Sequence, residues 1–282
     1  MEGTVPHTTP LKLVLLGGGD RAEEIAGVLT AKHPPSELRV VVAEAVGDVA
    51  QQELADADAA YGTLTPELLA AAPKLRWLQC PAAAPVGNYY FPELVASDVV
   101  VTNMRGIYDE ELSIHTLTLM LGVNRQMDRY HSQQLRHEYV KLPSSGAAGV
   151  DIPTATALLV GVGNAGGETA RLCKALGMAT IGVDARRTEP HPYVDELYGA
   201  QSLDEQLPRA DFVLSTIPHT PETEGLFDAR KFELMKPSSV FVNVWPHIHQ
   251  FRPLATCNFD VVVCLVILVH FHPLTHLSRQ PR

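Results

Sequence analysis

A glycine-rich segment near the middle of the chain carries the clearest chemical signal. Gly161, Gly163 and Gly166 follow a G-x-G-x-x-G spacing, and an acidic residue, Asp184, stands about 20 positions further on. The first glycine allows a tight turn, the second lets the backbone approach a pyrophosphate, and the third lets a helix lie close to its strand. N–H groups at the helix start would bind the phosphates, and Asp184 would accept a ribose 2′-OH. The pattern predicts a dinucleotide site.

The choice of cofactor depends on the residues around Asp184. A carboxylate there repels a 2′-phosphate, whereas Arg186 and Arg187, two and three positions on, attract one. The acidic residue in the ribose position favours NAD, with NADP as the alternative. A glycine-rich turn also occurs in other α/β proteins, such as methyltransferases, and this alternative stays open on the glycines alone.

The flanking sequence predicts the elements that position these residues. Apolar runs of strand length alternate with segments of helical period, which indicates parallel sheets covered by helices on both faces. A long helix is expected over Asp109 to Arg129, with an apolar stripe of Leu112, His115, Leu119 and Val123. A loop is expected from Gln133 to Val150. The predicted strands are Leu11–Leu16, Leu38–Val42, Ala59–Tyr61, Leu75–Gln79, Val99–Thr102, Ala157–Val160, Ala179–Val183, Phe212–Ser215 and Ser239–Val244.

Composition limits the class of protein. A chain of 282 residues suits one or two domains. With 46% hydrophobic and 19% charged residues, an ordinary globular protein is expected. The net charge of -10 argues against nucleic acid or an anionic membrane as a partner. Four scattered cysteines form no disulfide or metal framework and no secretory signal is recognisable, so we expect a cytoplasmic protein without a metal site.

The segment from about Lys74 to Val244 resembles the D-isomer-specific 2-hydroxyacid dehydrogenases, in the branch that reduces glyoxylate and hydroxypyruvate. The matching pieces are RWLQCPAAAPV, VVVTNMRGIYDEELSIH, LLVGVGNAGGETARLCKALGMATIGVD and ADFVLSTIPHTPETEGLFDARKFELMKPSSVFVNV. The last piece, with Thr-Ile-Pro, Pro-x-Thr and Met-Lys-Pro at their spacings, is more specific than the glycines. The resemblance implies an α/β chain of two similar, doubly wound parallel-sheet domains. These are a substrate domain over 1–107 and a Rossmann NAD(P)-binding domain over 108–244.

The resemblance also implies a reaction and its residues. Members reduce a small 2-keto acid with NAD(P)H and form homodimers. By position, the residues implied for the cofactor are Gly161, Gly163, Asn164, Ala165, Gly166, Asp184, Arg186, Thr216, Ile217, Pro218, Thr223 and Val244. Those implied for the substrate are Arg105 and the loop Pro81, Ala82 and Ala83, whose backbone amides meet a carboxylate. Two positions depart from the family pattern, since Ala84 replaces a usual glycine and Ile114 a common glutamate.

The sequence leaves the family pattern after Val244. The family continues with Gly-Arg-Gly and later a glutamate and a histidine, which polarise the keto group, hold a protonation state and donate a proton. Here Pro246 stands in the place of the arginine, and nothing downstream matches the other two, so no catalytic residue is assigned. The expected fold is therefore incomplete, with an unrelated tail over 245–282, and weak or no turnover is expected. The alternative function is a non-catalytic NAD-binding or interaction protein.

The tail itself has an unusual composition. It contains no glycine, lysine or glutamate, and its histidines cluster. We interpret it as a sequence never selected to complete the fold, such as a retained intron or a frameshift. Its two His-x-His pairs, His247 with His249 and His270 with His272, could bind a metal, although no carboxylate or cysteine framework accompanies them. The apolar run Val261 to Val269 could be a membrane anchor, although it falls short of the roughly 20 residues that a spanning helix needs.

Overall fold

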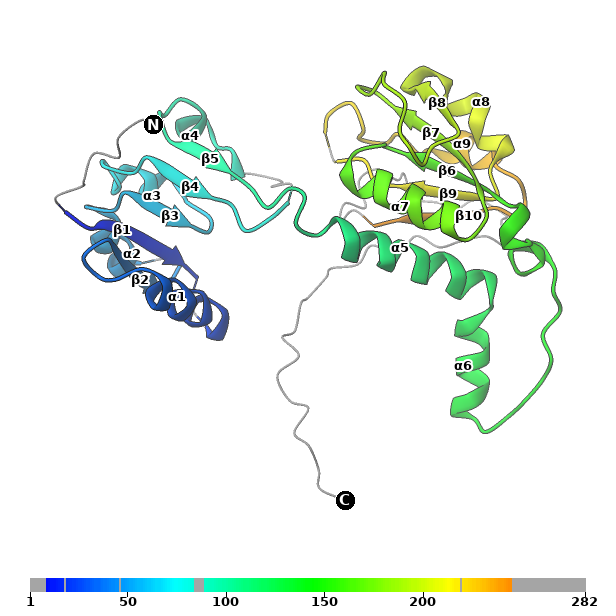
Figure 1. Cartoon of the computed structure of the whole chain (residues 1–282), viewed down its shortest axis with the longest axis horizontal. Helices are drawn as coiled ribbons and strands as arrows, with labels where there is room; N and C mark the ends of the chain where they lie inside the picture. The colour runs from blue at the N-terminus through cyan, green and yellow to red at the C-terminus, as the bar shows by residue number, and fades with distance from the viewer. Residues whose placement is uncertain (1–8, 18, 46, 84–88, 219, 245–282) are drawn as a thin grey trace. The chain divides into compact units, whose positions relative to one another are not determined.

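The computed structural model describes residues 9–17, 19–45, 47–83, 89–218 and 220–244, so the tail lies outside the described residues. The chain divides into two compact units, one ending at Tyr108 and the other beginning at Asp109 (Figure 1). Each unit contains a five-stranded sheet whose strands are all parallel. The predicted α/β fold with two parallel sheets is confirmed.

Unit 1 has the strand order β2-β1-β3-β4-β5. Its core lies between the sheet and its helices and includes Val14, Leu54, Leu68 and Leu78, all nearly inaccessible to solvent. The elements are β1 (Leu11–Leu16), α1 (Asp20–Lys32), β2 (Leu38–Ala43), α2 (Asp48–Leu54), β3 (Ala59–Tyr61), α3 (Pro66–Ala70), β4 (Trp77–Gln79), α4 (Pro92–Val95) and β5 (Val100–Thr102).

Unit 2 has the strand order β10-β9-β6-β7-β8, so its first strand pairs with its second and its fourth. From β6 the strand order runs through β7 to β8 on one side and through β9 to β10 on the other, so the order reverses between β6 and β9. The elements are α5 (Asp109–Asn124), α6 (Met127–Leu135), β6 (Thr156–Val160), α7 (Asn164–Ala175), β7 (Ala179–Asp184), β8 (Glu196–Gly199), α8 (Leu203–Gln206), β9 (Phe212–Ser215), α9 (Ala229–Leu234) and β10 (Val240–Asn243).

Side chains alternate between the two faces of the unit 2 sheet along each strand, and each face carries its own buried cluster. Leu159 points to the face that packs against α5 and α7, where Leu117 and Cys173 join the same core. Its neighbour Leu158 points to the opposite face and packs with Phe227 and Leu207. Burial on both faces explains why the strands read as unbroken apolar runs rather than as alternating patterns.

The long helix expected over Asp109 to Arg129 is wrong in its length, and its buried face is only partly as predicted. Helix α5 ends at Asn124, and Gln126 has a left-handed backbone (φ 52°) from which α6 starts in a new direction. The predicted stripe is half-buried, with Leu119 and Val123 packed against the core, whereas the fully buried residues are Ser113, Thr116, Leu117, Met120 and Asn124. The hydroxyl groups of Ser113 and Thr169 take part in the contact with α7, which a search for apolar periodicity misses.

Three smaller expectations also need correction. Helix α7 begins at Asn164, four residues before Glu168, where the helical period of the sequence begins, since glycines at a helix start hide its period. The half-buried edge strand β8 was not expected, and the strand expected over Leu75–Gln79 is only three residues long. The loop expected from Gln133 contains the end of α6 and a short 3-10 turn over Gly146–Gly149. Within the described part of the chain, no helix is long and apolar enough to cross a membrane.

Candidate dinucleotide-binding site

The glycine-rich turn joins β6 to α7 in unit 2 and is closely packed. Gly161 has φ 91°, and a Cβ atom there would lie 3.0 Å from Ile217 Cγ2 and 3.2 Å from Thr216 Oγ1. At Gly166 a Cβ atom would collide with the carbonyl oxygen of Gly161 and would lie 2.8 Å from Thr216 Oγ1. Glycine is therefore required at both positions, at the first for its backbone conformation and at the second for space.

Thr216 connects this turn to the neighbouring strand. It follows β9 directly, its N–H donates to the carbonyl of Val160 at 2.9 Å, and its Oγ1 donates to the carbonyl of Gly161 at 3.0 Å. Thr216 and Ile217 are half-buried, whereas Pro218 is exposed. The carboxyl ends of β6 and β9 are thus locked side by side, at the edge where open α/β sheets bind ligands.

The first turn of α7 has the geometry that a pyrophosphate needs. Gly163 is the N-cap and is exposed, and a Cβ atom built there would meet no described heavy atom within 4 Å. Asn164 is exposed and Ala165 half-buried, and no side-chain cap occupies this helix start among the described residues. Their N–H groups and the positive end of the helix dipole face open space, which suits an anionic diphosphate.

Asp184 is the last residue of β7, and its carboxylate is held by backbone N–H groups. Oδ2 accepts from Val162 at 2.7 Å, and Oδ1 accepts from Arg186 at 2.8 Å and Arg187 at 2.7 Å. Partial burial raises the pKa of this carboxyl, but the three backbone donors and the nearby Arg187 outweigh it and hold the pKa below its ordinary value. Asp184 is therefore ionised at neutral pH.

The two arginines after Asp184 lie in different surroundings. Arg186 is exposed, whereas Arg187 is half-buried and donates from Nε to the carbonyl of Val162 at 2.9 Å. The imidazole of His191 covers Gly167 so closely that a Cβ atom there would collide with it. Burial and the nearby Arg187 lower the pKa of His191. Sequence reasoning missed the contacts of Arg187 and His191, because each bridges segments that no short motif connects.

The last two residues implied for the cofactor are placed differently. Thr223 stabilises the loop after β9, since its Oγ1 donates to the carbonyl of Pro218 at 2.7 Å and accepts from the N–H of Thr220 at 2.8 Å. Val244 directly follows β10, and the residue is 4% exposed, in the core that it shares with Leu117 of α5. Its side chain is therefore not available to a ligand.

The residues implied for the substrate lie together in unit 1. Pro81, Ala82 and Ala83 follow β4, and Arg105 lies in the segment after β5. The N–H of Met104 donates to the carbonyl of Ala82 at 3.1 Å, which joins the two segments. The N–H of Ala82 donates to Cys80 Sγ at 3.4 Å, and proline has no N–H, so Ala83 has the loop amide that is not used internally among the described residues.

Together, the strand order of unit 2, the crowded glycines and the carboxylate at the end of the second strand define a dinucleotide-binding α/β domain. Residues 117–244 match the family model of the D-isomer specific 2-hydroxyacid dehydrogenase, NAD binding domain. The chain belongs to this family, whose members are NAD(P)-dependent enzymes.

Individual relatives agree with this assignment. D-3-phosphoglycerate dehydrogenase of Mycobacterium bovis is 32% identical over 187 residues, which are 64% of this chain and 33% of that protein. Glyoxylate/hydroxypyruvate reductase B of Citrobacter koseri is 30% identical over 199 residues, 68% of this chain and 60% of that one. A solved D-isomer specific 2-hydroxyacid dehydrogenase family protein from Aeromonas salmonicida superposes with a TM-score of 0.70 at 27% identity, covering 83% of this chain and 73% of that one. The matches thus span about a third to three-fifths of these curated relatives.

Proposed function

We propose that this chain is an oxidoreductase of the 2-hydroxyacid dehydrogenase type, which reduces a small 2-keto acid such as glyoxylate or hydroxypyruvate with NADH, or alternatively NADPH. The observation that supports the cofactor half of this proposal is the crowding of Gly161 and Gly166 against Thr216, beside the ionised Asp184. This arrangement leaves the start of α7 open to a diphosphate and places an acceptor at the end of the adjacent strand.

Each part of the site has a separate task in this proposal. The first-turn N–H groups of α7 bind the pyrophosphate, Asp184 accepts from the adenosine ribose, and Thr216 to Pro218 line the nicotinamide side. The bound cofactor would supply a hydride. In unit 1, the Ala83 amide and the exposed Arg105 are the donors available to a substrate carboxylate.

We further propose that turnover by this chain is weak or absent. Keto reduction requires stabilisation of the developing oxyanion and a proton donor in addition to the hydride. The sequence after Val244 has Pro246 in the position of the family's polarising arginine, and this segment lies outside the described residues. The same departure favours a second candidate, a cytoplasmic NAD-binding or interaction protein without catalysis.

Titration with NADH, followed by an activity assay on the same sample, tests both candidates. We expect NADH to bind, with oxidation near background on glyoxylate and hydroxypyruvate. Gly166→Ala should abolish binding, whereas Gly27→Ala, on the exposed side of α1 in unit 1, should not change it. If the wild-type chain does not bind NADH, the cofactor site is wrong. Substantial turnover would instead contradict the proposal that this chain has lost catalysis.

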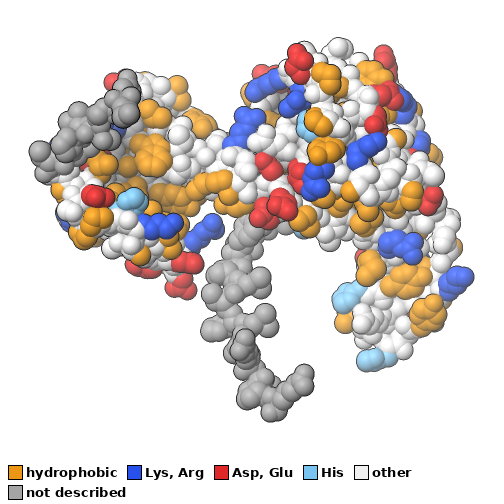
Figure 2. Space-filling model, viewed as in Figure 1, with side chains coloured by type: hydrophobic (Ala, Val, Ile, Leu, Met, Phe, Trp, Pro, Cys, Tyr) orange, Lys and Arg blue, Asp and Glu red, His pale blue; other side chains and the backbone are white. Residues whose placement is uncertain are grey.

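We propose that the partner of unit 2 is a second copy of this chain, which binds through helix α6 and the segment that follows it. Apolar side chains here are exposed, including Met127 (57%), Leu135 (70%) and Tyr139 (82%). Over this part of unit 2, Figure 2 shows hydrophobic side chains beside basic side chains and histidines. The segment carries Arg129, Arg136 and Lys141 against Asp128 and Glu138. The same segment of a second copy would cover the exposed apolar side chains.

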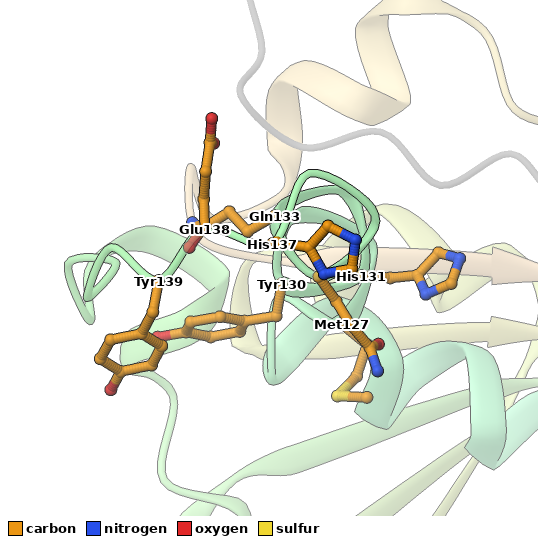
Figure 3. Close-up of a pocket in the computed structure, with 8 residues that line it drawn as sticks. Met127, Tyr130, His131, Gln133, His137, Glu138 and Tyr139 are labelled. Carbon is orange, nitrogen blue, oxygen red and sulfur yellow. The ribbon is translucent and has the colours of Figure 1, made fainter.

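The geometry of this segment suits a preformed interface. Tyr130, His131, His137 and Tyr139 line a pocket with Met127 (Figure 3). The returning chain is fixed by hydrogen bonds, for example from the N–H of Val140 to Gln133 Oε1 at 2.7 Å. Sedimentation equilibrium should give a dimer, and Leu135→Glu together with Tyr139→Glu should give a monomer. A wild-type chain that sediments as a monomer would contradict this assembly.

A further inference from the structure

Both backbone groups of Val162, the residue between the first two glycines of the turn, are held by hydrogen bonds from the end of β7 and the loop that follows it. The N–H of Val162 donates to Asp184 Oδ2 at 2.7 Å, and its carbonyl accepts from Arg187 Nε at 2.9 Å. Gly161 and Gly163 have no side chains with which to fix this segment. Because glycine loses more conformational freedom on ordering than other residues, such a turn needs external contacts to keep one shape.

The carboxylate of Asp184 is largely occupied before any ligand arrives. Its two oxygens offer about four acceptor positions, of which Arg186, Arg187 and Val162 take three. The unoccupied position is on Oδ2, because Oδ1 already accepts two N–H groups. A ribose has two adjacent hydroxyl groups that a carboxylate with both oxygens available would bind together. Asp184 retains capacity for one.

The two neighbouring arginines differ in whether their side chains already make a hydrogen bond within the protein. The guanidinium of Arg187 is fixed in position by the bond from its Nε to the Val162 carbonyl, whereas the exposed Arg186 has no side-chain hydrogen bond among the described residues. Of these two, only Arg186 can turn toward a ligand without loosening the glycine-rich turn. The pair therefore combines a structural contact and an available cation in adjacent positions.

We propose that Asp184 and Arg187 are positioning residues that fix the Val162 backbone before the cofactor binds, so that Asp184 binds a single ribose hydroxyl and Arg186 is the cation that can turn toward a 2′-phosphate. This inference deepens the proposed function and rests on it for the ligand. The contact between the two loops exists without ligand, so its failure and that of the cofactor site can be distinguished.

Amide hydrogen exchange of the full chain without cofactor tests the positioning role. In Asp184→Asn, the carboxamide keeps one oxygen for Arg186 and Arg187 but turns an NH₂ group toward the N–H of Val162. We expect exchange at Val162 to rise at least about tenfold, the loss of one charge-assisted hydrogen bond. Arg187→Ala should raise it as well, and Arg186→Ala, the matched neighbour, should not. Unchanged exchange at Val162 in Asp184→Asn, with the amides of β6 and β7 still protected, would overturn the proposal.

Binding of reduced nicotinamide mononucleotide, which lacks the adenosine ribose, separates positioning from ribose contact. Loss of a ribose acceptor alone leaves its affinity unchanged, whereas a displaced turn weakens it. We expect a loss of about fivefold in Asp184→Asn and in Arg187→Ala, and none in Arg186→Ala. If all three variants bind the mononucleotide as tightly as wild type does, Asp184 is only a ribose acceptor and the positioning role is contradicted.

Analogues of NADH test the single remaining acceptor position. Removal of one adenosine-ribose hydroxyl, the 2′ or the 3′, should weaken binding about tenfold, and removal of the other by less than about twofold. Equal losses for both would show that both are bound and would overturn the single-acceptor claim. Arg186→Ala should weaken NADPH more than NADH, and an equal effect on both would overturn its assignment. If NADH does not bind the wild-type chain at all, the proposed function fails while the exchange result at Val162 still decides the contact.

Discussion

Each unit contains a strand, a glycine-rich turn and a helix in succession, yet only one of these turns has the geometry of a dinucleotide site. In unit 1, Cβ atoms built at Gly17 and Gly19 would meet no described heavy atom within 4 Å. In unit 2, a Cβ atom at Gly166 would collide with the Gly161 carbonyl. The glycines of the first turn supply a backbone conformation, with φ of 121° and 102°. In the second turn Gly161 also has a positive φ, but Gly166 in addition allows the helix to approach the strand.

The second strands differ as well. Strand β2 ends on Ala43, and the exposed Glu44 that follows it makes no hydrogen bond to the glycine-rich turn among the described residues. Strand β7 ends on Asp184, whose carboxylate joins the turn to the following loop. Unit 1 thus has the same succession of elements without a carboxylate bonded to the turn and without the close packing. The comparison teaches that glycine content alone does not identify a dinucleotide site. Spacing that crowds the helix against its strand, together with a carboxylate at the next strand's end, does.

The largest effect should come from Gly166→Ala. Its Cβ atom would collide with the carbonyl of Gly161 and crowd Thr216 Oγ1, neither of which can move without disturbing the sheet edge. We expect unit 2 to lose about 3 kcal/mol of its unfolding free energy and NADH affinity to fall more than about a hundredfold. Urea unfolding and NADH titration measure the two quantities.

Gly167→Ala is the matched control in the same helix. Here the Cβ atom would collide with the ring of His191, the end of a side chain in a loop that can rotate away. The expected loss is at most about 1 kcal/mol, partly offset by the better helix propensity of alanine. Comparable losses in both variants would mean that the close approach of backbone at Gly166 is not the determining feature.

The stability of unit 2 should depend on pH through the carboxylate of Asp184. Because the folded pKa of Asp184 is lowered, its contribution to stability is complete above the unfolded pKa of about 3.9 and is lost as the pH falls through the folded value. Asp184→Asn should therefore be less stable than wild type at pH 7, and the difference should shrink below about pH 4. Urea midpoints of unit 2 across this range measure it. A constant difference at all pH values would contradict the linkage.

Thr216→Val should have a smaller effect. The variant keeps the shape of the side chain but removes the donor to the Gly161 carbonyl at 3.0 Å. We expect a loss of about 1 kcal/mol in unit 2 and about a fivefold weaker affinity for NADH. Thr118→Val is the control, because Thr118 is exposed and its Oγ1 donates only within α5, to the carbonyl of Ile114. Equal effects of the two substitutions would exclude a specific role for Thr216.

Much of the sheet architecture and part of the site follow from local sequence. The strands of unit 2 are buried on both faces, so they read as apolar runs, and the turn that includes Gly161 and Gly166 is contained within one strand–helix unit. The contacts that complete the site are not local. Thr216 meets Gly161 across 55 positions and Arg187 meets Val162 across 25, and no short motif encodes either pair.

The end of α5 shows a second limit of sequence reasoning. The left-handed residue at the break is Gln126 rather than glycine or asparagine, so no turn signal precedes α6. The polar part of the buried face of α5 was also missed, since Ser113 donates to the Ala165 carbonyl at 3.0 Å and accepts from Thr169 at 3.1 Å. Such hydrogen bonds depend on the partner helix, which apolar periodicity does not reveal.

The smallest expected effect is a gain in stability rather than a loss, and it concerns Gly27 of unit 1. Gly27 is exposed in the interior of α1, and a Cβ atom there would meet no described heavy atom within 4 Å. Since alanine loses less conformational freedom than glycine in a helix, Gly27→Ala should stabilise unit 1 by about 0.5–1 kcal/mol and leave the NADH affinity unchanged. Urea unfolding and the same titration check both values. A change in cofactor affinity would show that a glycine outside the crowded turn also shapes the site, and the contrast between the two turns would then fail.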